Sequence, residues 1–252
     1  MTNSGQLRCE GLSKSFDGVR ALADVQLEFP SAGIVAIIGP NGAGKTTLLN
    51  VLTGFLRPDA GRIVFDDWEL TRMAPHKIAR RGIGRTFQDL RLITQVTVLE
   101  NVMLARPNQK GERLLPALLR FGVAKEEGEN RKEAMRRLKF VGLEEKVNEL
   151  AGELSYGQQK LLTLACCLAT GARILLLDEP VAGVHPEMVS KILGLLRELR
   201  DEGKLVVFIE HDIASVREVA DLMVVMDEGK IIAQGKPAEV LQRPEIIEAY
   251  VG

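Results

Sequence analysis

A glycine-rich loop that ends in lysine and threonine is the most specific chemical pattern in this sequence. Residues 39–46 read GPNGAGKT and fit the phosphate-loop pattern G-x-x-x-x-G-K-[ST]. Glycine lets backbone N–H groups approach phosphates closely, and a helix that begins at the loop adds positive potential. We therefore expect Lys45 to reach the β- and γ-phosphates of a nucleotide and the Thr46 hydroxyl to ligate Mg²⁺. The loop residues expected to bind nucleotide are Gly39, Asn41, Gly42, Gly44, Lys45, Thr46 and Thr47.

Two carboxylates follow a second hydrophobic run, over residues 174–177. In open parallel sheets, ligands bind at the carboxyl ends of the strands. Asp178 is expected to hold Mg²⁺, directly or through water, and Glu179 to act as general base toward the attacking water. The alternative is a purely structural role, in which the two acids only end a strand before a proline turn. The phosphate loop argues against that alternative.

A histidine follows a third hydrophobic run, which covers residues 205–210. A single histidine at a strand end is more often structural than catalytic. His211 would nevertheless share the strand edge with the phosphate loop, and it is therefore expected to reach the γ-phosphate as a catalytic residue.

These residues need a parallel sheet to bring them together. Alternating or continuous apolar runs predict strands, and longer periodic stretches predict helices. A buried strand before the phosphate loop and a helix after it are the context that this motif requires, which argues against a plain glycine turn.

Residues 89–168 predict a mostly helical lobe, with a helix over 126–140 and a loop over 106–130 that holds a short helix at 114–121. The tail, 235–252, is expected to be helical. Strands are predicted at 22–29, 33–38, 62–65, 174–177, 205–209 and 222–226, and further helices at 46–56, 186–202 and 214–220.

Bulk composition limits the function classes. The 252 residues suffice for one sizeable α/β domain with an inserted lobe, and a net charge of -1 disfavours generic nucleic-acid binding. Cys9, Cys166 and Cys167 form no C-x-x-C pair, so a reducing compartment is expected and the adjacent pair is predicted to be buried. Residues 1–8 lack the apolar core of a signal peptide, and 161–177 fall short of a spanning helix.

The segment LSYGQQK, residues 154–160, resembles the L-S-G-G-Q signature of the nucleotide-binding subunits of ABC transporters. The resemblance runs essentially end to end, with the motifs in family order. It implies an α/β fold: a P-loop NTPase (RecA-like) core with an antiparallel β subdomain and an inserted α-helical subdomain. The chain would form a single ABC ATP-binding domain, with residues 1–88 and 169–252 as the catalytic core and 89–168 as the helical subdomain.

The resemblance also implies roles for further residues. Phe16 would stack on adenine, and Gln88 would contact Mg²⁺ and the attacking water as a catalytic residue. Two subunits would pack head to tail, so that the signature of one caps the γ-phosphate of ATP held by the other through Ser155, Gly157 and Gln158. Two positions depart from the family pattern: Tyr156 stands where the signature has glycine, and His185 stands where the loop that crosses the dimer interface usually has aspartate.

Several stretches resemble one branch of this family, the larger ATPase subunit of bacterial branched-chain amino-acid importers. They are GIGRTFQ at 82–88, YGQQ at 156–159, the ending 245–252 and the insertion 106–130. The branch implies transmembrane permease subunits, a second ATP-binding subunit (in a homodimer or heterodimer) and, indirectly, a substrate-binding protein as partners. The location would be peripheral, on the cytoplasmic side of the bacterial inner membrane.

Alternatives stay open at this point. Urea or amide importers and the lipopolysaccharide-export ATPase share much of the pattern, and a soluble ABC ATPase without a transporter is a different class. No nucleic-acid partner is expected. Leu90, Leu92 and Ile93 either line a groove for a permease helix or form ordinary lobe core, with equal weight.

Overall fold

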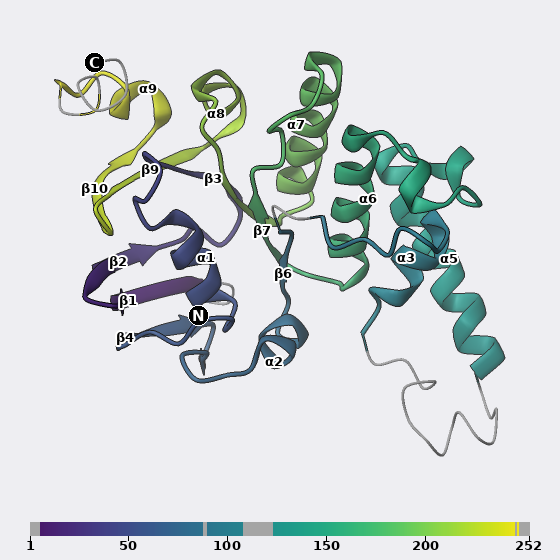
Figure 1. Ribbon diagram of the computed structural model, residues 1–252, viewed down its shortest axis with the longest axis horizontal. Coiled ribbons are helices and arrows are strands. Elements are labelled where there is room, and N and C mark those ends of the chain that lie inside the picture. Colours follow the sequence, from purple (N-terminus) through teal and green to yellow (C-terminus); the bar gives the residue numbers. More distant parts are fainter. Residues whose placement is uncertain (1–5, 88–89, 108–122, 245, 247–252) are drawn as a thin grey trace.

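The computed structural model describes residues 6–87, 90–107, 123–244 and 246. In this part of the chain, two sheets lie toward one end of the molecule and a group of helices lies at the other (Figure 1). No helix of the described ranges is long and apolar enough to cross a membrane.

The larger sheet carries the predicted site. Its six strands run in the order β10-β9-β3-β8-β7-β6, and all neighbours are parallel except β10 against β9. Their bounds are β3 Gly33–Ile38, β6 Ile83–Arg85, β7 Ile174–Asp178, β8 Leu205–Ile209, β9 Leu222–Asp227 and β10 Lys230–Gly235. The predicted strands 33–38 and 205–209 are confirmed with the same bounds, and the parallel pairing is confirmed with them.

Burial on both faces explains why the central strands are continuous apolar runs. Successive side chains of a strand point to opposite faces. In β3, Ile34, Ala36 and Ile38 join the hydrophobic core on the helical side, whereas Val35 and Ile37 join the core on the opposite side. Any polar substitution in this strand would therefore place a polar group in one of the two cores.

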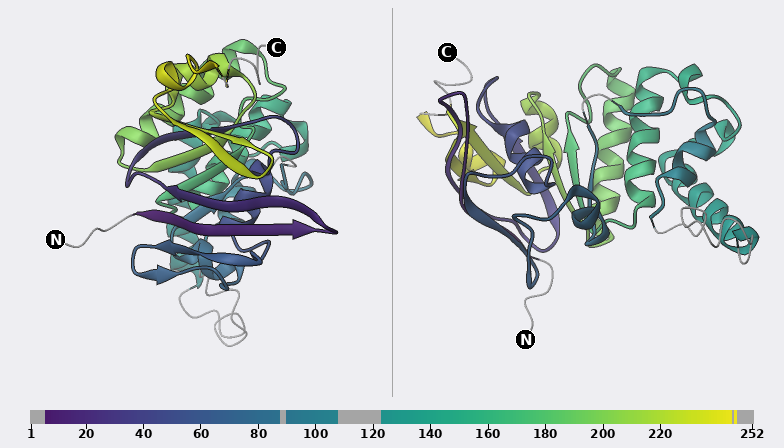
Figure 2. Two further views of the ribbon diagram at one scale, coloured as in Figure 1. Left: turned by 90° about the vertical axis from the view of Figure 1, so that its left-hand side faces the viewer. Right: turned by 60° about the horizontal axis from the view of Figure 1, so that its bottom comes forward.

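The smaller sheet is antiparallel and has the order β2-β1-β4-β5 (Figure 2). It consists of β1 Leu7–Phe16, β2 Val19–Glu28, β4 Ala60–Phe65 and β5 Trp68–Glu69. Helix α1 (Lys45–Leu52) shares its core, through Leu12, Leu48 and Leu49 among others. The phosphate loop is thus positioned between two sheets that are packed on the same helix.

The helices of the middle region pack on one another. These are α3 (Val98–Leu104), α5 (Val123–Val141) and α6 (Tyr156–Ala169), with short 3₁₀ turns at Glu144–Lys146 and Ala151–Glu153. Their apolar faces form a common core that contains Val102, Leu138 and Leu161. Figure 1 shows this group beside α7 (Pro186–Asp201), which lies between it and the sheet.

Three sequence predictions need correction. The helix predicted over 46–56 ends at Leu52, because Gly54 adopts a left-handed φ of 73°. The tail was predicted to be helical from residue 235, but Gly235 is the last residue of strand β10. The described helix α9 covers only Pro237–Val240. Strands β1, β5, β6 and β10 and helix α2 (Pro75–Arg80) were not predicted. The loop predicted over 106–130 is wrong from residue 123 on, because helix α5 begins at Val123. Helix α8 (Ile213–Val219) agrees with its prediction within one residue, and the helix predicted at 114–121 lies outside the described residues.

Candidate nucleotide site

Two of the three predicted catalytic residues, Glu179 and His211, meet at one edge of the larger sheet. In the parallel register, Ile37 of β3 and Asp178 of β7 are both paired with Ile209 of β8. The phosphate loop, Glu179 and His211 follow the ends of these three strands. The sheet therefore places a glycine-rich loop, a carboxylate and an imidazole side by side, as the sequence predicted.

Lys45 is buried inside the phosphate loop. Its Nζ donates hydrogen bonds to the carbonyl oxygens of Gly39 at 2.7 Å and Pro40 at 2.8 Å, and the residue is 6% exposed. Burial lowers the pKa of this ammonium, while the negative charges of Glu179 and Asp178 oppose the shift. A cation held by carbonyls at this edge is poised to exchange them for phosphate oxygens.

Close approaches of the backbone explain two of the loop glycines. A Cβ on Gly39 would lie 2.2 Å from the carbonyl oxygen of Met226, and one on Gly44 would lie 2.3 Å from that of Ala21. Gly44 also has a left-handed φ of 96° and starts helix α1. Thr46 and Thr47 then fall in the first turn of that helix, whose first backbone N–H groups have no partner within the helix.

Asp178 is paired with an arginine that the sequence analysis did not select. Arg85 Nη2 lies 3.3 Å from Asp178 Oδ2, and Arg85 Nη1 also donates to Asn50 Oδ1 at 2.7 Å. Burial raises the pKa of Asp178, while Arg85 pulls it down. A charged residue at the end of a short apolar run, 83–85, is the signal that could have identified Arg85.

Glu179 adopts a left-handed backbone conformation, with φ 49°. Its N–H donates to the carbonyl oxygen of Ile209 at 3.1 Å, and its carbonyl oxygen accepts a hydrogen bond from Lys160 Nζ. Its carboxylate oxygen Oε1 lies 3.2 Å from His211 Nε2. The structure thus brings the two residues predicted as general base and γ-phosphate contact within hydrogen-bonding distance of each other.

Glu210 is a buried carboxylate behind this pair and was also missed. It is 2% exposed, and its Oε1 accepts the N–H of Val181 at 2.8 Å. Burial raises its pKa, while the N–H groups of Val181 and His211 and the charge of Lys160 lower it. The missed signal is an acid directly after a five-residue apolar strand.

The signature segment forms the N-terminus of α6. Ser155 Oγ accepts the N–H of Gln158 at 3.4 Å, and Gln158 Oε1 accepts the N–H of Ser155 at 3.0 Å, which makes a capping box. Since the Ser155 hydroxyl acts as acceptor in the cap, its own proton stays available for a ligand. A Cβ on Gly157 would lie 2.9 Å from Met188 Cγ, so a side chain there would push α6 from α7.

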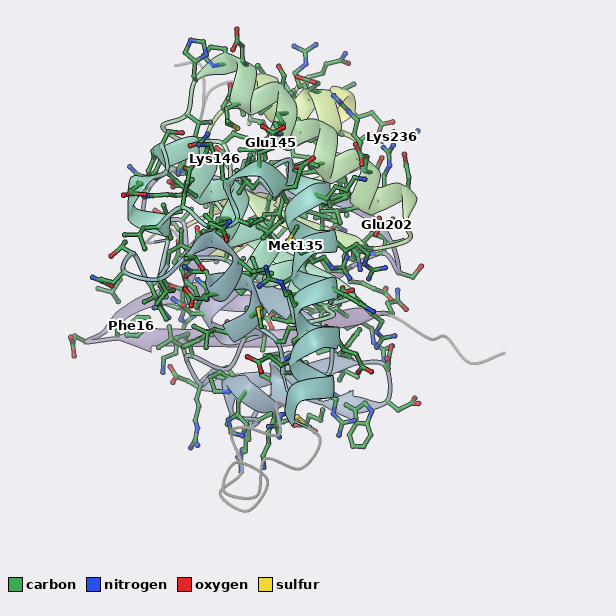
Figure 3. All side chains as sticks on the ribbon, turned by 90° about the vertical axis from the view of Figure 1, so that its right-hand side faces the viewer. Phe16, Met135, Glu145, Lys146, Glu202 and Lys236 are labelled. Atoms are coloured by element: carbon green, nitrogen blue, oxygen red, sulfur yellow. The ribbon has the colours of Figure 1, made fainter. Side chains whose placement is uncertain are left out.

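Two predicted residues lie apart from this cluster or outside the description. Phe16 ends β1 and is 41% exposed; Figure 3 shows it toward one tip of the antiparallel strands. An exposed ring at this place is free to stack on a base. Gln88 lies outside the described residues.

Mg²⁺ fits the oxygen donors at this edge. Among the described residues, no group of three or more His, Cys, Asp and Glu side chains could hold a metal by itself. Mg²⁺ commonly uses one or two protein oxygens together with water and substrate phosphates. The buried Asp178 carboxylate and the exposed Thr46 hydroxyl supply that donor chemistry.

An open groove of about 350 Å³ runs beside the site, between β6 and the helical group. Leu90, Leu92 and Ile93 line it, together with Phe87 and Leu104. Ile93 and Leu104 are 47% and 57% exposed. The three residues therefore line a groove, and Leu92 also contacts the helical core; that a permease helix occupies the groove stays a prediction.

Comparisons with known proteins agree with one another. The family model described as ABC transporter matches residues 22–182. The chain is 40% identical over 98% of its length to the high-affinity branched-chain amino acid transport ATP-binding protein BraF of Pseudomonas aeruginosa, of which it covers 97%. It is 39% identical to the corresponding protein LivG of Escherichia coli K12, with the same coverage of both chains.

Solved structures give the same picture. The fold is similar to a nucleotide-free ATP-binding cassette from an ABC transporter, with a TM-score of 0.86, 36% identity and 98% coverage of each chain. It is also similar to a dimeric post-hydrolysis state of an ATP-binding cassette bound to ADP and Pi, with a TM-score of 0.77, 28% identity and coverage of 92% and 98%.

Proposed function

This chain belongs to the ABC transporter family, and from that premise we propose that it binds and hydrolyses ATP to energise import of branched-chain amino acids. The observation that carries the chemistry is the Glu179–His211 contact of 3.2 Å beside the phosphate loop. The names of the relatives BraF and LivG support branched-chain amino acids as the transported substrate.

Binding begins with the phosphates. The backbone N–H groups of residues 39–46 and the Lys45 ammonium surround the β- and γ-phosphates, and Phe16 stacks on adenine. Lys45 gives up the carbonyls of Gly39 and Pro40 and bonds phosphate oxygens in their place. The new bonds join the ammonium to an anionic oxygen, so both partners are charged, whereas the bonds that they replace join it to neutral carbonyls.

Hydrolysis uses the two groups at the sheet edge. A water oxygen attacks the γ-phosphorus, the bond from that phosphorus to the β–γ bridging oxygen breaks, and Glu179 accepts a proton from the water. His211 donates to the γ-phosphate and holds the Glu179 carboxylate in place. Gln88 orients the same water. The products are ADP and inorganic phosphate.

Thr46, Asp178 and Gln88 would hold Mg²⁺ in this proposal. Bound with the nucleotide, Mg²⁺ would neutralise charge on the β- and γ-phosphates. The Asp178 carboxylate is fixed in position for this role. Its side chain pairs with Arg85, and its N–H donates a hydrogen bond to Thr86 Oγ1 at 3.2 Å.

A second ATP-binding subunit completes each site. Ser155, Gly157 and Gln158 at the N-terminus of α6 contact the γ-phosphate held by the partner, where the Ser155 hydroxyl and the helix dipole favour negative charge. ATP then favours the closed dimer, and hydrolysis releases it. The groove lined by Leu92 receives a permease subunit, which places the chain peripherally on the cytoplasmic side of the membrane.

The test removes the general base with Glu179→Gln, a substitution that keeps the size and shape of the side chain. Glu179→Gln protein is incubated with ATP and Na⁺ without Mg²⁺ and analysed by size-exclusion chromatography. We expect ATP, and not ADP, to produce a dimer. Protein that binds no ATP would contradict the nucleotide function, and a monomer that binds ATP would indicate an obligatory, different ATPase partner.

A further inference from the structure

Lys160 is the one cation of the signature segment 154–160, and its ammonium contacts the loop that carries Glu179 in its own subunit. It lies in the second turn of α6, is 9% exposed, and its Nζ donates to the carbonyl oxygen of Glu179 in the same subunit. The same helix therefore carries Ser155 at its N-terminus and a contact to the catalytic loop one turn later.

The contact fixes a backbone conformation that glutamate rarely adopts by itself. A non-glycine residue with positive φ is strained, and a residue before proline is disfavoured in helical conformations. Glu179 has φ 49° and precedes Pro180. Its two peptide groups are held from opposite sides, by the carbonyl of Ile209 and by Lys160. Its carboxylate is directed to His211 from this backbone.

Three carboxylates act electrostatically on the Lys160 ammonium. Burial lowers its pKa, and the charges of Glu210, Glu179 and Asp178 each raise it, in that order. Arg85 already pairs with Asp178, and backbone N–H groups already bond Glu210. Lys160 thus supplies a positive charge at the point where the ends of β7 and β8 and helix α6 meet.

Tyr156 covers this contact. The Lys160 ammonium lies 5.3 Å from the centre of the Tyr156 ring, within the range of a cation–π interaction. A Cβ on Gly183 would lie 3.3 Å from Tyr156 Cε1, so the ring also touches the loop after Glu179. The residue that departs from the signature glycine therefore joins α6 to the same catalytic segment.

From this geometry we infer that Lys160 is a positioning residue that couples the signature helix to the catalytic glutamate of its own subunit. The inference rests on the proposed ATPase function. Because Lys160 on α6 holds the carbonyl oxygen of Glu179 at the end of β7, any displacement of α6 relative to β7 would change the backbone conformation that directs the Glu179 carboxylate to His211. In the proposed dimer the N-terminus of α6 contacts the nucleotide held by the partner subunit. Lys160 on the same helix therefore connects that nucleotide site to the Glu179 of its own subunit.

The test replaces Lys160 with methionine, which keeps much of its length and removes its hydrogen-bond donors. We expect Lys160→Met to lower kcat for ATP hydrolysis at least about tenfold, while KM changes by less than about twofold, because positioning acts on the chemical step. Lys160→Arg keeps a donor and is expected to restore most of kcat. Lys132→Met, at an exposed position of α5, is the matched control and should retain wild-type kinetics.

The outcomes separate the two proposals. Unchanged kcat in Lys160→Met would overturn the role of Lys160. A loss of kcat accompanied by an equal loss of ATP affinity and thermal stability, without rescue by Lys160→Arg, would overturn it too, because a merely structural residue behaves in that way. A wild-type chain that does not hydrolyse ATP would contradict the ATPase function instead.

Discussion

Arg85 and Asp178 form a buried ion pair, with Arg85 Nη2 3.3 Å from Asp178 Oδ2 and side chains that are 5% and 3% exposed. The pair joins strand β6 to the end of β7. Arg85 also donates to Asn50 and Thr53 of the α1 region and lies 4.8 Å from the centre of the Phe87 ring. One guanidinium thus links the groove beside β6 with the proposed metal ligand.

Removing Arg85 should destabilise the protein strongly. Breaking a buried ion pair leaves an uncompensated charge, which typically costs about 3–5 kcal/mol. We expect Arg85→Ala to lower the free energy of unfolding by about that amount, measured by urea denaturation. The control is Arg62→Ala, since Arg62 pairs with Glu10 on the surface, where side chains are 60% and 37% exposed. The unfolding curve of Arg62→Ala should match that of the wild type. Equal curves for the two variants would mean that the buried pair stabilises the fold no more than the surface pair.

A side chain at Gly44 should disrupt the phosphate loop. Gly44→Ala must place a Cβ 2.3 Å from the Ala21 carbonyl oxygen at a φ of 96°. We expect loss of ATP binding, measured by fluorescent-nucleotide titration, and a stability loss of more than about 1 kcal/mol. Gly194→Ala, within α7, meets no atom within 4 Å and should instead raise stability by about 0.5–1 kcal/mol. A Gly44→Ala protein that binds ATP normally would refute this account of the loop.

A charge in the groove should block the permease without affecting the nucleotide. Leu92 lines the groove beside β6, so Leu92→Glu is expected to abolish co-purification with permease subunits and to leave ATP affinity unchanged. Ile232→Glu introduces the same charge at a 40% exposed position of β10 and should assemble normally. Lost ATP binding in Leu92→Glu would instead assign Leu92 to the folded core.

The three thiols, of which those of Cys9 and Cys167 are buried and that of Cys166 is half-buried, should resist alkylation and should weaken the fold at alkaline pH. Burial raises the pKa of Cys166 and of Cys167 to about 12 from 9.0, and it raises that of Cys9 further. At pH 8 the folded protein should therefore react with iodoacetamide far more slowly than the urea-unfolded chain, because the thiolate is the nucleophile.

The sign of the pH effect follows from proton binding. Between pH 9 and pH 12 the unfolded thiol has lost its proton while the folded thiol keeps it, so the free energy of unfolding falls as pH rises, by at most about 1.4 kcal/mol per pH unit for each thiol. Cys167→Ala should show a shallower slope than the wild type over this range. Equal slopes would mean that Cys167 does not contribute.

Local patterns in the sequence determined much of the framework. Strands 33–38 and 205–209 are buried on both faces, so they are continuous apolar runs that can be recognised without tertiary information. The phosphate loop, the two acids at the end of β7 and the histidine after β8 could be assigned to one edge because the carboxyl ends of parallel strands share that edge. Strand β1 was missed because a register shift between Cys9 and Leu12 breaks the alternation of its buried residues.

Only the tertiary structure could decide the contacts between segments far apart in the chain. Arg85 and Asp178 are 93 residues apart, and Lys160 and Glu179 are 19 apart on different elements. No periodicity or motif encodes such a pair, because each depends on how β6, β7 and α6 pack. The sequence by itself determined which residues can perform phosphate chemistry; the packing of the helical group against the sheet decided which side chains hold them in place.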